Sequence, residues 1–282
     1  MISEYQFLKL SDGVELQCNA FERGMDKWLI VTHGIAEHHA RHYYLNDLFP
    51  DFNLFFYDLR GHGRSGGERG SIDNFGQFYD DLKEVIQFSQ SQFRMKKYAL
   101  YGHSMGSLIT AGTMQRYASK IDVKPSIVFL SGPPVGFGGP VGKLANVLNK
   151  TVLPYLRYIP YSVALPGLVD LKYLSHKKGV REDYERDPLC QLKLQTKLLL
   201  EMANAARDVF SRPLRLPCPG VVAYGSEDQV ISIEMLKDYF SEVEKEFEIK
   251  EFKGAYHEIH NEIEKCQAPY FKFLQDKINS SF

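Results

Sequence analysis

The chain has 282 residues, enough for one large α/β domain or a domain with an insertion, and enough to bury a sizeable core. Hydrophobic residues make up 44% and charged residues 24%, which are ordinary values for a globular protein. Because 34 Lys and Arg residues stand against 35 Asp and Glu residues, the formal net charge is −1. This balance excludes a global electrostatic attraction to nucleic acid, and we expect no polynucleotide partner.

A hairpin and an alternation of strands and helices organise most of the chain. The turn signal Ser11-Asp12-Gly13 separates two apolar segments, residues 5–9 and 14–21, and predicts an antiparallel hairpin. Short apolar runs then alternate with helical segments, which indicates a mostly parallel, eight-stranded sheet with helices on both faces. The later predicted strands are residues 28–32, 54–57, 98–101, 127–130, 221–224 and 247–252, and the predicted helices include 75–92, 107–117 and 268–279.

The alternation breaks between residues 135 and 214, where proline, glycine and apolar residues mix and no clear strand is evident. We interpret residues 135–212 as an inserted helical cap, and residues 1–134 and 213–282 as the core. Residues 136–169 contain no acidic residue and three basic ones, Lys143, Lys150 and Arg157. Four apolar residues there share one helical face, Leu144, Val147, Leu148 and Val152. This pattern predicts a cap helix packed on the core, and it also suits peripheral contact with anionic lipid.

The rest of the cap is more polar. Residues 170–187 carry charges of both signs and predict a solvated face or loop, and helical periodicity returns over residues 189–210. Pro213 and Pro217 mark the return to the core sheet.

The cysteines and the N-terminal residues bear on the compartment. The four cysteines, Cys18, Cys190, Cys218 and Cys266, form no C-x-x-C pair and have no zinc-type spacing to histidine, so we expect isolated reduced thiols. Residues 1–6 lack a basic region followed by an apolar one, and no stretch is long enough to span a bilayer. We therefore expect a cytoplasmic protein that can associate peripherally with a membrane surface.

The segment Gly102-His103-Ser104-Met105-Gly106 follows an apolar run and leads into a helix-forming stretch. A serine between small residues at a strand-to-helix switch is typical of a nucleophile elbow, where the hydroxyl is presented beside free backbone N–H groups. The G-x-S-x-G pattern recurs around Ser65, but a glycine-rich, charged segment follows that copy and predicts a loop. The alternative for Ser104 is an unreactive helix N-cap.

A serine hydroxyl needs a base, and the base needs an acid that holds its tautomer. In the chain order nucleophile, acid, histidine, the base must follow Ser104, which leaves His257 and His260 once His176 is assigned to the cap. His257 comes directly after the loop that follows residues 247–252, so we predict it as the base. Asp228 and Glu227 both follow residues 221–224, and we prefer Asp228 for its shorter side chain.

Two backbone donors are predicted for the oxyanion of an acyl-transfer reaction, Met105 N–H after the serine and Ile35 N–H after residues 28–32. The histidines His38, His39 and His42 invite a metal reading, but no H-E-x-x-H pattern or clear third ligand accompanies them, so we predict no metal site. The glycine-rich residues 61–70 lack the lysine and the spacing of a phosphate-binding loop.

With these residues assembled, the sequence resembles the monoglyceride lipase and lysophospholipase group of the α/β-hydrolases. Four segments carry the resemblance across nearly the whole chain: His33-Gly34-Ile35-Ala36-Glu37-His38 followed by Arg41, Asp58-Leu59-Arg60-Gly61-His62-Gly63-Arg64-Ser65, Gly102 to Gly106, and Gly254-Ala255-Tyr256-His257.

The resemblance implies an α/β-hydrolase fold, a triad of Ser104, Asp228 and His257, and an oxyanion hole from Ile35 and Met105. It also suggests that Glu37, Arg41 and His260 lie near the glycerol end of the substrate and that the cap lines an acyl channel.

We therefore expect a cofactor-independent serine hydrolase that releases a fatty acid from a single-chain lipid ester. Monoacylglycerol is the first candidate substrate, and a lysophospholipid is the second. A carboxylesterase, a thioesterase, a peptidase and a non-catalytic binding protein of the same fold are the alternatives.

Overall fold

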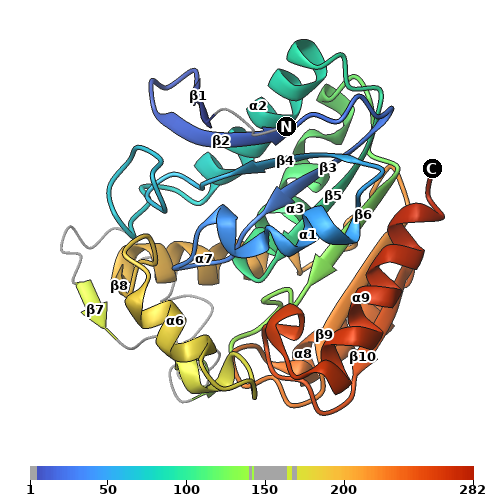
Figure 1. Cartoon of the computed structure of the whole chain (residues 1–282). Helices are drawn as coiled ribbons and strands as arrows, with labels where there is room; N and C mark the ends of the chain where they lie inside the picture. Colours follow the sequence, from blue (N-terminus) through green and yellow to red (C-terminus); the bar gives the residue numbers. More distant parts are fainter. Residues whose placement is uncertain (1–4, 140–141, 143–163, 167–169) are drawn as a thin grey trace.

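The structure is a computed structural model that describes residues 5–139, 142, 164–166 and 170–282 (Figure 1). Its centre is an eight-stranded sheet in the order β1-β2-β4-β3-β5-β6-β9-β10. The strands are β1 Tyr5–Lys9, β2 Glu15–Phe21, β3 Lys27–Thr32, β4 Asn53–Tyr57, β5 Lys97–His103, β6 Ile127–Ser131, β9 Gly220–Gly225 and β10 Phe247–Phe252.

The sheet is mostly parallel, as the sequence predicted. From β4 to β10 every neighbouring pair of strands is parallel, whereas β1 pairs antiparallel with β2, and β2 pairs antiparallel with β4. The predicted hairpin therefore lies at one edge of the sheet, and β10 lies at the other (Figure 1). Parallel strands point the same way, so their carboxyl ends lie along one border of the sheet, which we call its carboxyl edge. The loops after β3, β5, β9 and β10 all begin there.

Helices cover both faces of the sheet, because alternate residues of each strand enter different cores. Trp28 and Ile30 of β3 pack in one core with side chains of α2, α3, α7 and α8, while Leu29 and Val31 pack in the other with α1 and α9. The α-helices are α1 Tyr44–Leu48, α2 Gly76–Gln92, α3 Met105–Tyr117, α6 Val180–Arg186, α7 Thr196–Val209, α8 Ile233–Asp238 and α9 Glu264–Asn279. Short helical turns are η1 His39–His42, η2 Ala118–Lys120, η3 Leu171–Tyr173, η4 Tyr239–Val243 and η5 Ile259–Asn261.

The predicted strands of the core all exist, and the predicted helix over residues 75–92 matches α2 within one residue. The last helix begins at Glu264, four residues before its predicted start, although Pro269 lies inside it. Cys266 and Tyr270 are buried on its inner face, so packing against the sheet extends the helix beyond what local propensity indicates.

The region interpreted as the cap differs from its prediction in two places. It contains two short strands, β7 Ala164–Pro166 and β8 Lys193–Gln195, which pair antiparallel, where no clear strand was expected. The helical periodicity over residues 189–210 is borne out only from Thr196 onward. Before Thr196 the chain forms a turn and then β8, and its backbone is bound to core loops: Gln191 N–H donates to Ala36 O, and Gln195 N–H donates to Gly70 O.

The polar segment over residues 170–187 contains helix α6, whose outer face carries the exposed pair Arg181 and Glu185 and whose Tyr184 is buried. The predicted amphipathic cap helix with Leu144, Val147, Leu148 and Val152, and the basic residues Lys143, Lys150 and Arg157, lie outside the described residues. Within the described part of the chain, no helix combines the length and the apolar character needed to cross a bilayer.

Candidate active site

Three loops at the carboxyl edge of the sheet bring the predicted triad residues together. Ser104 follows β5, Asp228 lies shortly after β9, and His257 lies shortly after β10. Parallel pairing between β5 and β6, between β6 and β9 and between β9 and β10 places these three loops side by side. The fold therefore joins side chains that are far apart in the sequence.

Ser104 lies at a sharp turn between β5 and α3. Its φ of 51° and ψ of −120° fall in a region that residues with a Cβ atom rarely adopt, which costs roughly 1–3 kcal/mol. The turn also requires small neighbours, since a Cβ on Gly102 would lie 2.6 Å from Gly106 O, and a Cβ on Gly106 would lie 2.2 Å from Thr32 O. The two glycines thus allow α3 to start close against β3 and β5, with the serine hydroxyl at the turn.

The three side chains form one hydrogen-bonded row. His257 Nε2 lies 2.9 Å from Ser104 Oγ, and His257 Nδ1 lies 2.7 Å from Asp228 Oδ2. Asp228 Oδ1 accepts the backbone N–H groups of Val230 and Ile231, at 2.8 and 3.1 Å. Those bonds fix the carboxylate, so the donor to Asp228 is Nδ1–H and the unprotonated Nε2 faces the serine.

Electrostatics make the His257 imidazole a stronger base than usual. Burial by itself lowers the pKa of His257, but the charge and hydrogen bond of Asp228, with the charges of Glu258 and Glu37, outweigh burial and raise it. The rival acid Glu227 is more than half exposed, and its nearest histidine is His176 at 3.9 Å. The geometry therefore pairs His257 with Asp228 rather than with Glu227.

The residues 33–37 after β3, which we call the oxyanion loop, lie beside the serine. A Cβ on Gly34 would be 3.1 Å from Ser104 Cβ, which shows how closely the loop passes the serine. Among the described residues, neither Ile35 N–H nor Met105 N–H has a hydrogen-bond acceptor. Both predicted donors are therefore available to a ligand beside Ser104.

His33 holds the peptide plane that carries Ile35 N–H. Leu59 N–H donates to His33 Nε2 at 2.9 Å, so the ring proton is on Nδ1, which donates to Gly34 O at 2.8 Å. Burial lowers the pKa of His33 to about 3, and the ring stays neutral over the working pH range. Since Gly34 C=O and Ile35 N–H belong to one peptide unit, fixing the carbonyl also orients the N–H.

Glu37, the last residue of this loop, and Arg41 belong to a buried hydrogen-bond network, whereas both ring nitrogens of the buried His260 lack a hydrogen-bond partner among the described residues. Glu37 Oε1 accepts Gly34 N–H at 2.5 Å, and Arg41 Nε donates to Glu37 Oε2 at 3.2 Å. Arg41 Nη2 donates to both carboxylate oxygens of Glu258, at 3.0 and 2.7 Å. Burial alone raises the pKa of Glu37, but His42, His103 and Arg41 outweigh it and lower the pKa well below its usual value.

His260 stacks on Tyr44, with ring centres 5.0 Å apart, and lies 4.9 Å from the ring of His103. Burial and the neighbouring histidines hold the pKa of His260 well below 6.5, so its ring is neutral. Direct contact of Glu37, Arg41 or His260 with a substrate stays a prediction.

The three histidines of residues 38–42 have separate partners. His38 Nε2 donates to Asp187, His39 Nδ1 to Asp58 and His42 Nε2 to Glu37. Ligand atoms of His38, Asp187 and Cys190 do lie within 4.8 Å of one another, but His38 and Asp187 are in direct hydrogen-bond contact at 2.8 Å. The observed cluster joins the segment after β3 to the segment after α6 by a polar contact.

Ser65, the serine of the second G-x-S-x-G copy, lies in a loop as predicted. Its buried hydroxyl donates to Asp58 O at 2.6 Å and accepts Gln17 N–H at 2.9 Å. Both bonds fasten the loop to its neighbours, and within the described parts of the chain no side-chain base is hydrogen-bonded to the Ser65 hydroxyl.

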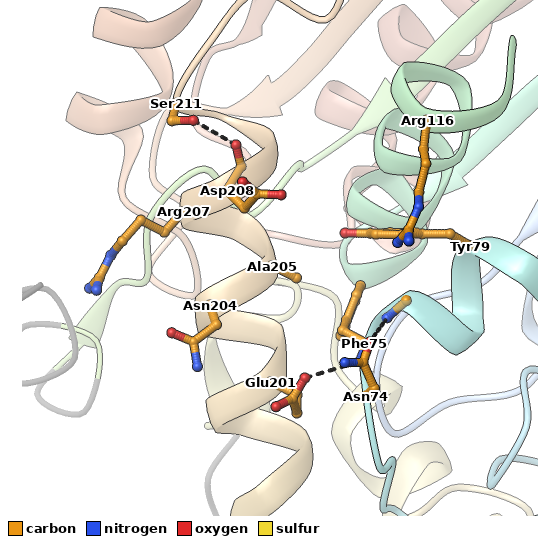
Figure 2. Close-up of a pocket in the computed structure, with 11 residues that line it drawn as sticks. Asn74, Phe75, Tyr79, Arg116, Glu201, Asn204, Ala205, Arg207, Asp208 and Ser211 are labelled. Carbon is orange, nitrogen blue, oxygen red and sulfur yellow. Dashed lines mark hydrogen bonds between the residues drawn. The ribbon is translucent and has the colours of Figure 1, made fainter. Parts of the chain in front are cut away.

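A polar groove of about 500 Å³ between α7, α3 and the start of α2 holds none of the predicted site residues (Figure 2). Glu201 of α7 reaches across it and accepts Phe75 N–H at 3.1 Å, and Arg116 and Tyr79 are among the other lining residues (Figure 2). Acidic and basic groups both line this groove, and no nucleophile with a base faces it. The arrangement is that of a helix–helix contact.

Two partners of the site were missed by sequence reasoning. Glu258, which binds Arg41, follows His257 directly, and a carboxylate next to a predicted base was a usable signal. Tyr184, whose hydroxyl donates to Ile35 O, was an isolated aromatic residue in a charged segment. The structure shows that this tyrosine is buried in contact with Ile35.

A mostly parallel sheet with helices on both faces, and a serine, histidine and aspartate in one row at its carboxyl edge, define an α/β-hydrolase. A sequence model of the family described as "Serine aminopeptidase, S33" matches residues 24–264. The chain belongs to this family.

Relatives with known names agree with this assignment. The chain is 26% identical over 240 residues to the monoacylglycerol lipase of Mycolicibacterium smegmatis, covering 84% of this chain and 82% of that one. It is 28% identical over 269 residues to the monoglyceride lipase of Homo sapiens, covering 90% and 83%. The crystal structure of the Paleococcus ferrophilus monoacylglycerol lipase superposes with a TM-score of 0.81 at 24% identity, covering 95% and 100%, and thereby shows the same fold.

Proposed function

We propose that this protein is a serine hydrolase that cleaves the carboxylic ester of a monoacylglycerol. The observation that carries the proposal is the continuous row from Ser104 through His257 to Asp228, with contacts of 2.9 and 2.7 Å. Named relatives that span most of the chain are monoacylglycerol lipases, which supports the substrate class.

In the proposed reaction, Ser104 Oγ attacks the ester carbonyl carbon while its proton passes to His257 Nε2. The carbonyl electron pair moves to oxygen, where Ile35 N–H and Met105 N–H stabilise the charge. The tetrahedral intermediate collapses, His257 gives its proton to the leaving glycerol oxygen, and an acyl-serine remains. Water then repeats the sequence, with His257 again as base, and releases the fatty acid.

The buried charges behind the oxyanion loop favour a neutral head group over a phosphate. The guanidinium of Arg41 lies between two carboxylates, Glu37 at 3.2 Å and Glu258 at 2.7 Å. An arginine paired on both sides has no free charge for a phosphate, so a lysophospholipid fits less well than a glycerol ester. We propose that Glu37, Arg41 and His260 form a polar wall near the glycerol.

The description of the family makes a peptidase the second candidate. An aminopeptidase must bind the free amine of its substrate, which an unpaired carboxylate does best. The buried Glu37 and Glu258 are both paired, and residues 136–169 of the proposed cap, residues 135–212, contain no acidic residue. A neutral lipid ester therefore suits the site better than an amine.

Purified protein compared on a monoacylglycerol, a lysophosphatidylcholine and an aminoacyl amide tests the substrate class, with the first expected to be hydrolysed fastest. Ser104→Ala should abolish turnover and leave the thermal midpoint near that of the wild type. A fluorophosphonate probe should label the wild type at one serine, as read by intact-mass spectrometry. Full esterase activity in Ser104→Ala would reject the assignment.

We also propose that residues 136–169, with the basic side chains of Lys143, Lys150 and Arg157, support peripheral contact with anionic lipid. Flotation with vesicles tests this: phosphatidylglycerol vesicles should carry more protein than phosphatidylcholine vesicles, and less after addition of salt. Equal recovery with both vesicle types contradicts it.

A further inference from the structure

We propose that residues 184–191 of the cap, which we call the cap strap, position the oxyanion loop for catalysis. The strap begins within α6 and ends before β8, and in Figure 1 these elements lie beyond the carboxyl edge of the sheet. The inference rests on the function proposed above, because it concerns the orientation of the Ile35 N–H donor.

The loop needs support because Ala36 adopts the left-handed backbone conformation, with a φ of 65°. The left-handed region is unfavourable for a residue with a Cβ atom, so a loop that was free to relax would rotate Ala36 towards negative φ. Such a rotation turns the adjoining peptide units, including the unit next to Ile35 N–H. The active arrangement therefore depends on neighbours that hold it.

The strap supplies two of these neighbours. Gln191 N–H donates to Ala36 O at 2.8 Å, and the Tyr184 hydroxyl donates to Ile35 O at 3.3 Å. The two acceptors, Ile35 O and Ala36 O, belong to the two peptide units that directly follow the unit carrying Ile35 N–H. A third bond, from His38 Nε2 to Asp187 Oδ2 at 2.8 Å, fastens the residue directly after the loop to the same strap.

Tyr184 is well placed for this role. Its side chain is 3% exposed, and the guanidinium of Arg41 lies 4.4 Å from its ring centre. Burial raises the pKa of Tyr184 well above its usual value, so the hydroxyl stays protonated and can only help the loop as a donor to Ile35 O. The ring packing and the hydroxyl bond are separable, because phenylalanine keeps the first and loses the second.

The peptide units before the donor are held by side chains of the loop itself. His33, whose Nε2 accepts Leu59 N–H, fixes Gly34 O, and Glu37 fixes Gly34 N–H. The peptide units before Ile35 thus depend on bonds within the loop and to Leu59, and those after it depend on the strap. Tyr184 and the backbone of Gln191 are positioning groups, since they act on the oxyanion through the loop.

The test compares Tyr184→Phe with Tyr117→Phe, which loses a hydroxyl bond to Asp80 between α2 and α3. On a monoacylglycerol, Tyr184→Phe should lower kcat about three- to tenfold with KM changed less than about twofold, because the oxyanion forms only in the transition state. Tyr117→Phe should leave both constants unchanged.

A long-chain alkyl trifluoromethyl ketone is an inhibitor whose inhibition constant should change if Tyr184 positions the oxyanion donor, and should not change if Tyr184 is purely structural. Ser104 Oγ adds to its carbonyl carbon, the proton goes to His257, and the oxyanion enters the proposed hole. Its inhibition constant should rise in Tyr184→Phe by the same factor by which kcat falls, and should not change in Tyr117→Phe.

A backbone pair provides the second measurement, and decides the question if Tyr184→Phe fails to fold. Gln191→Pro removes the N–H that binds Ala36 O, whereas Gln191→Ala keeps it, so only the proline variant should lose kcat and inhibitor affinity. Wild-type values in both Tyr184→Phe and Gln191→Pro overturn the role of the strap while the triad stands. A wild-type protein without esterase activity instead rejects the proposed function.

Discussion

The imidazole of His257 lies between the Ser104 hydroxyl and the Asp228 carboxylate, so in the proposed mechanism its protonation state decides whether the serine can be activated. Burial lowers its pKa, but Asp228 and the charges of Glu258 and Glu37 raise it above the ordinary 6.5. Part of the basicity of the site therefore comes from Glu258, which does not touch the reacting atoms. The carboxylates around the imidazole act together on one proton.

We predict an acidic limb in the pH profile of kcat/KM with a midpoint above 6.5, because the protonated imidazole cannot accept the serine proton. The rate should rise as pH passes upward through that midpoint. In Asp228→Asn the rate should fall by up to about 10⁴-fold, and the limb should move to lower pH, since the largest raising influence is gone. A wild-type midpoint below 6.5, or an unmoved limb in the variant, contradicts this prediction.

Ser104, His257 and Asp228 could be predicted because each follows an apolar strand in the order that this fold uses, and strand ends are visible in local sequence. The partners of the oxyanion loop could not. Arg41 meets Glu258 across 217 residues, and Tyr184 meets Ile35 across 149. Contacts of that separation depend on how distant segments pack in the folded chain, and no local pattern encodes that packing.

At the scale of elements, α3 is set unusually close to the sheet. Its first turn contains Gly106, and it packs against β3 and β5 as well as α2 and α7. Eleven of its residues are buried, so buried positions lie all around the helix, and this explains its weak amphipathic pattern. The sequence predicted this helix from its position after the serine and from its propensity.

Gly106→Ala should lower the free energy of unfolding by more than about 2 kcal/mol, because the new Cβ would lie 2.2 Å from Thr32 O, a backbone atom that cannot move aside. Urea denaturation measures the change. The matched control is Gly76→Ala at the start of α2, where the nearest atom is the end of the Asn74 side chain, and the change should stay within about 1 kcal/mol. Equal midpoints for the two variants would show that α3 can shift from the sheet.

The boundaries of elements were less predictable where tertiary bonds override local preference. Residues 189–195 have a helical period but form a turn followed by the strand β8, and Gln191 and Gln195 donate their backbone N–H groups to core loops. α9 starts early because its first turn packs against the sheet. In both places the deciding contact lies far away in the sequence.

At the scale of the whole molecule, the described residues form two hydrophobic cores on opposite faces of the eight-stranded sheet. Alternate residues of β3 enter different cores, so the sheet is buried on both sides over its centre. This explains why the predicted strands read as continuous apolar runs, and why the sheet and its strand positions were the most predictable part of the fold. The division of residues 135–212 from the core stays a prediction.

Leu108→Ala in α3 and Leu274→Ala in α9 should each lower the free energy of unfolding by about 2–5 kcal/mol, since both side chains are fully buried. The two side chains lie in different cores. Their effects should therefore add to within about 0.5 kcal/mol in the double variant, as measured by urea denaturation. A large deviation from additivity would mean that the sheet transmits strain between the cores.

The span of 153 residues between Ser104 and His257 has a consequence for the nascent chain on the ribosome. A ribosome exposes the serine long before it has made the aspartate, the histidine or the strap, so the early chain carries a hydroxyl with ordinary alcohol reactivity. Chemistry begins only after the last strand joins the sheet edge. In the proposed mechanism, an incomplete chain that lacks His257 therefore has no base to activate Ser104 against the lipids and esters around it.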